Sequence, residues 1–410
     1  MNKEDLLSRS KATIYELCVN IRERCVGSEG NRQATGFFKT TLESIGWTAF
    51  TQEFNAVDWN DGGAVLKAGG IDFPVLASPY SAGYSGSAEL AAVSSVQELR
   101  EGHFAGKILL LHGEIAREQL MPKNFVFYNP EEHQQIISLL EKSQVQALIC
   151  ATGRNAALAG GVYPFPLIED GDFDIPSVYM TDEEGERLLP FAGEAVNLRS
   201  VSERVPGRGC NVIGRKGEGG SGRIVVTAHI DAKKGTPGAI DNATGVAVLL
   251  LAAQLLNDYR GDHLVELVAL NGEDYYAVPG QMKYIADNQD QFGDMVLNIN
   301  IDGAAYKNSR SAFSYYNLPD HIMEKVSGIV DSHPDLVEGV PWVQGDHSIF
   351  VQYGVPAIAI SSQWFTENID SQDVTHTSKD NPGIVDYPAM VEIAVAIDAL
   401  IRGIQQGSMR

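Results

Sequence analysis

Apolar residues recur at helical spacing in the first part of the chain. Between residues 5 and 24 they include Leu6 and Ile14, and the spacing predicts a helix with one buried face. After a glycine-containing turn, a second helix is predicted to end at Ile45, just before Gly46. Glycine is common directly after a helix because it adopts the left-handed backbone conformation without strain. The chain is therefore expected to begin with two helices.

Strand-like and helix-like segments alternate from about Gly209 to the end of the chain. Strands are predicted at 223–228, 264–270, 295–301 and 356–361, and helices at 243–256, 279–286, 319–330 and 387–404. Such alternation predicts an α/β fold in which a mostly parallel mixed sheet is sandwiched by helices. The two N-terminal helices are expected to pack on this sheet.

The pattern is different between about Trp59 and Val205. Short alternating segments and many glycines surround one clear helix, Pro130 to Ser143, which predicts a β-rich insert with its own small core. At 410 residues the chain is also long for a single core. We therefore expect a discontinuous domain of residues 1–58 and 206–410 and an inserted domain of residues 59–205.

The composition limits the possible partners. Lys and Arg number 31 against 53 Asp and Glu, a formal net charge of −22, which argues against nucleic acid and anionic membranes as partners. The same charge suits a substrate with a free ammonium group, although a well-solvated surface explains it equally well. The longest apolar stretch, Val246 to Leu256, is too short to cross a bilayer. Acids at the start of the chain do not resemble a secretory leader, so a cytoplasmic location is expected unless a leader has been removed.

Residue types that bind metals follow the predicted strands at four places: His229 and Asp231 with the nearby Asp241, the pair Glu273-Asp274, Asp302, and His376. In an open α/β sheet the carboxyl ends of the strands open into one crevice, where residues far apart in sequence meet. Two histidines, several carboxylates and a spare glutamate are what two zinc ions and a general base require. The pattern predicts a two-metal hydrolase.

Each of these residues has a simpler interpretation when taken alone. Asp241 stands at the start of a predicted helix, where an aspartate is more often only an N-cap. Adjacent acids such as Glu273 and Asp274 usually form a solvated turn. Beside His229, however, Asp241 offers two oxygens that can bridge two cations, and Asp231 can accept the other N–H of the histidine ring. Together, the residues favour a metal site.

The stretches around these residues resemble the motifs of the co-catalytic zinc exopeptidases, a family that includes bacterial leucyl aminopeptidases and glutamate carboxypeptidase II. The similar stretches are Ala228–Asp231, Pro237–Gly245, Asn271–Asp274, Asp302-Gly303, His376-Thr377, and Gly345–Phe350 followed by Gly354–Ala357. The insert resembles a protease-associated domain at Gly106–Leu110 and Ile175–Val178. The resemblance implies the zinc exopeptidase fold with an inserted protease-associated domain.

The resemblance also implies a role for each residue. Two Zn²⁺ ions per chain are expected, with Co²⁺ or Mn²⁺ as possible substitutes. Asp241 would bridge the two metals, His229 and Asp302 would complete one site, Asp274 and His376 would complete the other, Glu273 would be the general base, and Asp231 would orient His229.

The chain departs from the family at one ligand. The family usually has two consecutive glutamates, whereas this chain has an aspartate at the second position, Asp274. The loss of one methylene shortens the reach by roughly 1.5 Å, about one C–C bond. Either the loop closes this gap or the second metal binds more weakly.

The expected function is that of a dimetal exopeptidase that hydrolyses peptide bonds through a metal-bound hydroxide with Glu273 as general base. An aminopeptidase acting on peptide or aminoacyl substrates with a free N-terminus is favoured, because more of the resembled family are aminopeptidases. Asp346 and His347 are candidate pocket residues, although a buried pair that ties down their loop is an equally good interpretation. The sequence does not indicate an oligomeric state.

Other functions remain open on the same scaffold. A carboxypeptidase or dipeptidase needs cations for the substrate carboxylate, and Lys233 and Lys234 keep that alternative open. A glutaminyl-cyclase-like enzyme typically uses one zinc, against which the full ligand set counts. A catalytically degenerate binding protein has only the unusual Asp274 in its favour.

Overall fold

The chain forms two compact units in the computed structural model, which describes residues 2–156 and 160–407. The first unit comprises the residues up to Ala56 and those from Arg208 onward, and the second comprises Val57–Gly207.

The sheet of the first unit has a parallel centre and antiparallel edges. Four parallel strands lie in the order β10 (Leu264–Leu270), β9 (Arg223–His229), β11 (Met295–Ile301) and β14 (Ala357–Ser362). On one side β8 (Ala195–Lys216) pairs antiparallel with β10, and on the other β12 (Ser311–Tyr316) pairs antiparallel with β14 and parallel with β13 (Leu336–Glu338). This confirms the predicted mostly parallel mixed sheet, and β10 and β11 have the predicted bounds.

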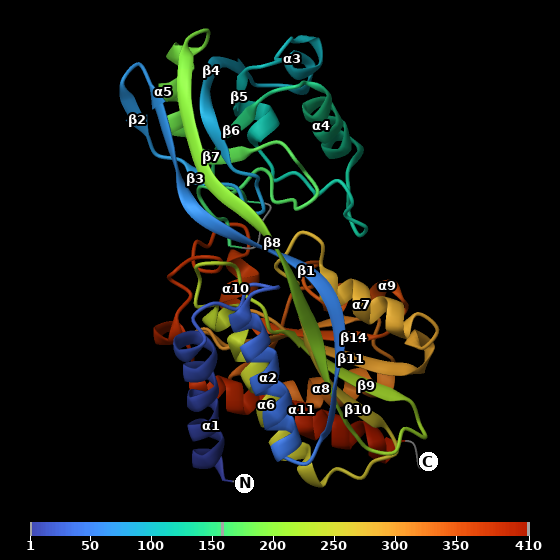
Figure 1. Cartoon of the computed structure of the whole chain (residues 1–410). Coiled ribbons are helices and arrows are strands. Elements are labelled where there is room, and N and C mark those ends of the chain that lie inside the picture. The colour runs from blue at the N-terminus through green and yellow to red at the C-terminus, as the bar shows by residue number, and fades with distance from the viewer. Residues whose placement is uncertain (1, 157–159, 408–410) are drawn as a thin grey trace. The chain divides into compact units, whose positions relative to one another are not determined.

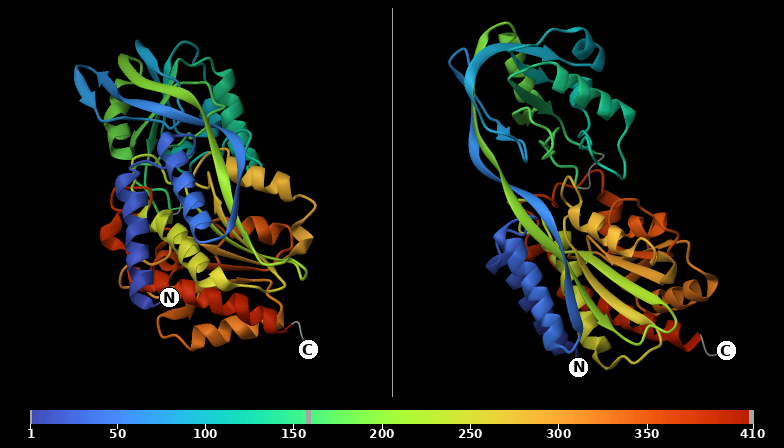
Figure 2. Two further views of the ribbon diagram at one scale, coloured as in Figure 1. Left: turned by 60° about the horizontal axis from the view of Figure 1, so that its bottom comes forward. Right: turned by 45° about the vertical axis from the view of Figure 1, so that its right-hand side comes forward.

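Helices cover both faces of this sheet (Figure 1). One face carries α1 (Lys3–Tyr15), α2 (Glu29–Ser44), α6 (Thr244–Leu255), α8 (Asp320–Asp331) and α11 (Tyr387–Gly407), and the other carries α7 (Pro279–Asn288) and α9 (His347–Gln352). The short α10 (Gln363–Asn368) follows β14. Figure 2 shows from two further sides that α1, α2 and α6 lie together. The first predicted helix is shorter than expected, because the α-helix gives way to a π-helical turn at Glu16–Asn20.

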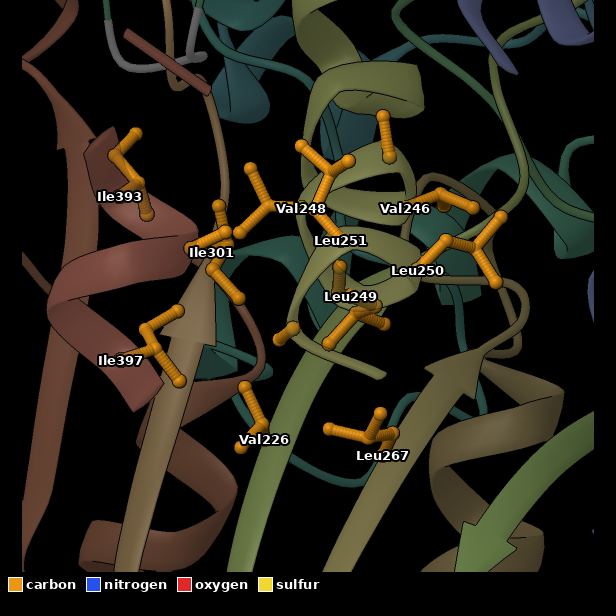
Figure 3. Packing of buried hydrophobic residues seen from close by; sticks show 14 of the residues in the cluster. Val226, Val246, Val248, Leu249, Leu250, Leu251, Leu267, Ile301, Ile393 and Ile397 are labelled. Carbon is orange, nitrogen blue, oxygen red and sulfur yellow. The ribbon is translucent and has the colours of Figure 1, made fainter. Parts of the chain in front are cut away.

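Helix α6 lies at the centre of the core. All of its residues from Thr244 to Ala253 are buried, as expected for a helix that is apolar on every side. Figure 3 shows Leu249 of this helix pointing toward Val226 and Leu267 of the sheet and Val248 lying beside Ile301, while Leu250 points to another side. With its flanking turns, Ala239–Asp258, the segment is long and apolar enough to cross a membrane by length and composition alone, but most of it is buried inside the protein. Its apolar surface is thus used for packing.

Strand β12 was not predicted. Its sequence contains two serines, and both Ser311 and Ser314 are buried, with the Ser314 hydroxyl donating a hydrogen bond to the Val340 carbonyl. Buried serines break the apolar run by which a strand is recognised in a sequence, because their burial depends on partners elsewhere in the chain.

The second unit contains a run of mostly parallel strands next to residues 195–200 of β8, with which β4 (Tyr84–Val93) pairs antiparallel. Strands β4, β5 (Ile108–Leu111), β6 (Ala147–Thr152) and β7 (Ser177–Thr181) are parallel, and β3 (Leu76–Ala77) is antiparallel to β7. The long β1 (Thr48–Ala68) pairs with β2 (Ile71–Phe73). The helices are α3 (Val96–Glu101), α4 (Glu131–Lys142) and α5 (Asp182–Leu188). The predicted helix corresponds to α4, while α3 and α5 are too short to produce a periodic signal.

Alternate side chains of these strands enter separate cores. In β5, Leu109 and Leu111 belong to one apolar cluster, while Ile108 and Leu110 belong to another. Because successive side chains of a strand point to opposite faces, both faces of this part of the sheet are buried.

Candidate metal centre

Three adjacent parallel strands of the first unit end at the candidate ligands. His229 is the last residue of β9 and pairs with Leu270 at the end of β10, and Asp302 directly follows β11. Because the strands are parallel and neighbouring, the residues after them share one edge of the sheet. This placement depends only on the order of the strands and on where each strand ends.

Five side chains meet at this edge, and we refer to them as the ligand cluster: His229, Asp241, Asp274, Asp302 and His376. Asp241 lies at the centre, with Oδ1 at 3.0 Å from Nε2 of His229 and Oδ2 at 3.1 Å from Nε2 of His376. Asp302 Oδ1 lies 3.4 Å from the same His229 nitrogen, and Asp274 Oδ1 lies 3.0 Å from the same His376 nitrogen. Each oxygen of Asp241 therefore faces a different histidine, which is the arrangement that a bridging carboxylate requires.

The cluster leaves buried polar atoms without hydrogen bonds. Within the described part of the chain, neither ring nitrogen of His229 makes a hydrogen bond of good geometry, and Oδ2 of Asp274 has no partner. Buried polar atoms without partners are costly unless something binds them. Imidazole nitrogens and carboxylate oxygens converging from a buried surface are the donor set of zinc. The residues therefore fit the binding of zinc.

The electrostatic field at the cluster also favours cations. Burial lowers the pKa of His376, but Asp274 and Asp241 outweigh burial and raise it to about 10. Burial likewise opposes the charged form of His229, and the carboxylates around it, Asp302 first, hold its pKa well above the usual range. The same potential that holds protons on two buried histidines attracts metal cations.

Asp231 holds the loop that carries two of the candidate residues. Its carboxylate accepts hydrogen bonds from the backbone N–H groups of Gly272, Glu273 and Asp274 at 2.6, 3.3 and 3.2 Å. Its Oδ1 also lies 3.7 Å from Nδ1 of His229, which is too long for the hydrogen bond expected from the sequence, so the orienting role of Asp231 stays a prediction. The three N–H bonds hold the loop against Asp231. With the loop in this position, the shorter side chain of Asp274 reaches His376.

Glu273 lies beside the cluster without being one of the five. Its side chain is half-buried, and its carboxylate has no hydrogen-bond or ion-pair partner among the described residues. Burial raises its pKa well above the usual range, and the negative charges of Asp274 and Asp302 raise it further. A carboxyl group in such surroundings has the properties of a proton acceptor in catalysis.

The simpler interpretation of Asp241 does not hold in the structure. Asn242, not Asp241, accepts a hydrogen bond from the N–H of Gly245 in the first turn of α6, at 3.0 Å. The Asn242 amide also donates to the carbonyl of Ile301, at 2.8 Å. Asn242 thus serves as the cap, while the Asp241 carboxylate faces the two histidines.

Asp346 and His347 lie next to the cluster and not in it. Asp346 is buried and accepts a hydrogen bond from the Gln281 amide at 2.9 Å, and His347 Nε2 lies 3.0 Å from the carbonyl oxygen of Trp342. Burial raises the pKa of Asp346 to about 7 and lowers that of His347 to about 4. Both residues fasten their loop to the protein, while a role in a substrate pocket stays a prediction.

Two buried residues near the cluster were not assigned a role from the sequence. Asp380 accepts hydrogen bonds from the backbone N–H groups of Ile240 and Asp241, and the guanidinium of Arg24 donates to carbonyls of the same loop. Asp380 lies four residues after His376, and this proximity was the only sequence signal for it.

Comparison with known proteins places these residues in a family context. Residues 211–401 match the sequence model of Peptidase family M28. Aminopeptidase YwaD of Bacillus subtilis is 21% identical over 313 residues, and the probable lipoprotein aminopeptidase LpqL of Mycobacterium tuberculosis is 25% identical over 299 residues. The matches cover 75% and 70% of this chain but only 64% and 55% of the two relatives, so the chain spans less than two thirds of their lengths.

Solved structures share the fold over most of the chain. An aminopeptidase from Aneurinibacillus sp. strain AM-1 superposes with a TM-score of 0.76 at 20% identity, covering 96% of this chain and 93% of that one. BSAP, a zinc aminopeptidase from Bacillus subtilis, superposes with a TM-score of 0.72 at 19% identity, covering 96% and 94%. The matched family region contains every residue of the ligand cluster together with Asp231 and Glu273. Over residues 211–401 the chain is therefore similar to peptidase family M28, and it shares the fold of these solved structures over most of its length.

Proposed function

We propose that the protein is a dizinc aminopeptidase that releases N-terminal residues from peptides. Residues 1–58 and 206–410 would form its catalytic domain, and residues 59–205 would be a protease-associated insert. The observation that carries the proposal is the position of Asp241, whose two oxygens face His229 and His376 separately.

The ligand cluster divides naturally into two sites around Asp241. His229 and Asp302 would hold one ion with it, and Asp274 and His376 would hold the other. When bound, two zinc ions would supply a water of lowered pKa and a Lewis acid for the scissile carbonyl.

The remaining chemistry falls to residues of the chain. As the water oxygen attacks the carbonyl carbon, Glu273 accepts the proton that the water loses. When the C–N bond breaks, Glu273 returns this proton to the leaving amine, so that the carboxylate is regenerated. Asp231 would keep Glu273 in place through its hydrogen bonds to the loop backbone.

The charges near the cluster support an aminopeptidase over a carboxypeptidase. Glu273, Asp302 and Asp346 offer carboxyl oxygens at or beside the cluster, and such oxygens suit the ammonium group of an N-terminus. The two lysines that could hold a substrate carboxylate have other contacts, since Lys233 lies over the ring of Tyr275 and Lys234 faces Glu23 at 3.7 Å.

Metal analysis and a matched substrate set test the proposal. We expect the dialysed protein to hold about two zinc ions per chain, as a two-metal hydrolase does. It should release p-nitroaniline from aminoacyl-p-nitroanilides and not from their N-acetylated counterparts, and a chelator should abolish release until zinc is restored. Turnover of the acetylated substrates, or only of peptides with a free C-terminus, would overturn the aminopeptidase assignment. No metal and no turnover would favour the binding protein.

The place of action stays a separate prediction. One relative is named a probable lipoprotein aminopeptidase and a similar solved structure is named a precursor, so export is proposed as the alternative to a cytoplasmic location. Fractionation of cells that produce the native protein would decide between the two.

A further inference from the structure

The backbone around Asp241 cannot satisfy its own hydrogen-bonding groups. Gly238 has a left-handed φ of 58°, and Asp241 and Asn242 have φ values of −125° and −140°, well away from helical geometry. The N–H groups of Ile240 and Asp241 therefore need a partner outside this loop. Asp380 is that partner, since one of its oxygens accepts from Ile240 at 2.7 Å and the other from Asp241 at 3.1 Å.

Arg24 holds the same loop by its carbonyl groups. The guanidinium donates to the carbonyl oxygens of Pro237 and Gly238, both at 2.8 Å, and to that of Ile230 at 3.1 Å. Arg24 is 2% exposed and Asp380 is fully buried. A buried cation thus holds the carbonyls of the loop and a buried anion holds its N–H groups.

Asp380 also connects this loop to the one that carries His376. Its own N–H donates to the Thr377 carbonyl at 3.2 Å, and its carbonyl accepts from Ala239 at 3.3 Å. The Thr236 hydroxyl donates to the same Thr377 carbonyl at 2.9 Å. His376 has a φ of 62°, a left-handed conformation that a non-glycine residue keeps only where its surroundings enforce it.

We infer that Asp380 is a positioning residue for the metal centre, which fixes the backbone of Asp241 against Arg24 and joins it to the His376 loop. Asp380 binds no metal in this arrangement. It sets the position of the one ligand that both ions share, so both sites depend on it. The inference rests on the proposed function, because it takes the ligand cluster to be a metal centre.

Cobalt binding separates this role from a merely structural one. The full-length protein is freed of metal and titrated with Co²⁺ alone, by calorimetry and by its visible d–d absorption, which reports ligand geometry. In Asp380→Asn, one N–H keeps an acceptor and the other faces an amide NH₂. Loss of outer partners of metal ligands typically weakens binding by about 10–100-fold. We expect a weakening of this size together with an altered absorption spectrum.

The second unit offers a matched control. Asp170 is also a buried aspartate whose two oxygens accept backbone N–H groups, from Lys123 at 3.1 Å and Asp172 at 2.7 Å. Asp170→Asn makes the same chemical change in a residue that has no bond to the ligand cluster or its loops. We expect it to lower the thermal stability of the protein and to leave the Co²⁺ affinity and spectrum as in the wild type.

The outcomes are distinguishable. If the wild type binds no Co²⁺, the proposed metal centre itself fails. If the wild type binds and Asp380→Asn binds equally well with the same spectrum, Asp380 is only structural and the inference is overturned. Should Asp380→Asn fail to fold, Thr236→Val decides, because it removes a link between the same two loops with little change in volume. A weakened Co²⁺ affinity in that variant supports the inference, and an unchanged affinity overturns it.

Discussion

The two units use polar residues at their strand ends in opposite ways. In the second unit, Ser95 follows β4 and accepts a hydrogen bond from the N–H of Glu98, and Thr181 ends β7 and accepts one from Glu184. Both are ordinary N-caps, which satisfy the free N–H groups of the following helix. In the first unit, His229 ends β9 and its buried ring nitrogens make no good hydrogen bond within the described chain.

This difference indicates which of two similar arrangements of strands and helices holds a binding site. Both units contain parallel strands followed by helices, so the architecture alone does not identify a site. In the second unit, Ser95 and Thr181 are satisfied locally, by N–H groups three residues further along the chain. In the first unit, polar atoms at the strand ends converge from distant parts of the chain and remain unsatisfied, which is the condition for binding something else.

Asp241→Asn should produce the largest loss. An amide presents only one oxygen, so it cannot face His229 and His376 with an acceptor each. We expect both metals to be lost on dialysis and hydrolysis to disappear with them, as measured by metal analysis and by p-nitroanilide turnover. Retention of both metals with normal turnover would mean that Asp241 does not bridge them.

Glu273→Gln should reduce turnover while leaving the metals in place. The amide cannot accept the proton of the attacking water, and general base catalysis contributes about 10²–10⁴-fold. In the second unit, Glu98→Gln is the control, because Glu98 accepts from the N–H and hydroxyl of Ser94 and has no part in the cluster. We expect turnover to fall only in the first variant, and a wild-type rate in Glu273→Gln would refute the base assignment.

Removal of the metals should destabilise the protein. A ligand that binds only the folded state, present at 100 times its Kd, adds about 2.7 kcal/mol to the free energy of unfolding. Chelation should therefore lower the Tm of the wild type, and zinc should restore it. Asp241→Asn serves as the control, since its Tm should not respond to zinc. Equal responses of the two proteins would place the bound zinc elsewhere.

Many strands and helices of the first unit could be predicted from the sequence, because the patterns that indicate them lie within short segments of the chain. The apolar runs that become β10 and β11 end at polar residues, and the parallel order follows from the alternation with helices. Asp302 could be placed at the carboxyl edge on that basis alone. The assignment of Asp241 as bridging depended on its distance from His229 along the chain and on the family resemblance, and its role stays a prediction.

What could not be predicted depends on contacts between distant segments. Asp380 lies about 140 residues from the N–H groups that it accepts, and nothing near it in the sequence indicates that partner. The three backbone hydrogen bonds of Asp231 likewise arise only when the loop after β10 folds against β9. The role of a buried polar residue depends on its hydrogen-bond partners, and these are brought next to it only by the tertiary fold.

The two units also differ in the residues that cap their helices. Replacing a capping residue should have the smallest effects on stability and activity. Thr181→Ala removes the cap on the N–H of Glu184, for which about 1 kcal/mol of stability is usual. We expect this loss in chemical denaturation and no change in Co²⁺ affinity or hydrolysis. Asn242→Ala removes the cap on Gly245 in the first unit, but Asn242 also follows Asp241 in the chain and donates to Ile301. This variant should lose both stability and metal affinity. If this variant lost stability alone, the position of Asp241 would not depend on Asn242. Asn242 would then act only as a helix cap, as Thr181 does at the end of β7.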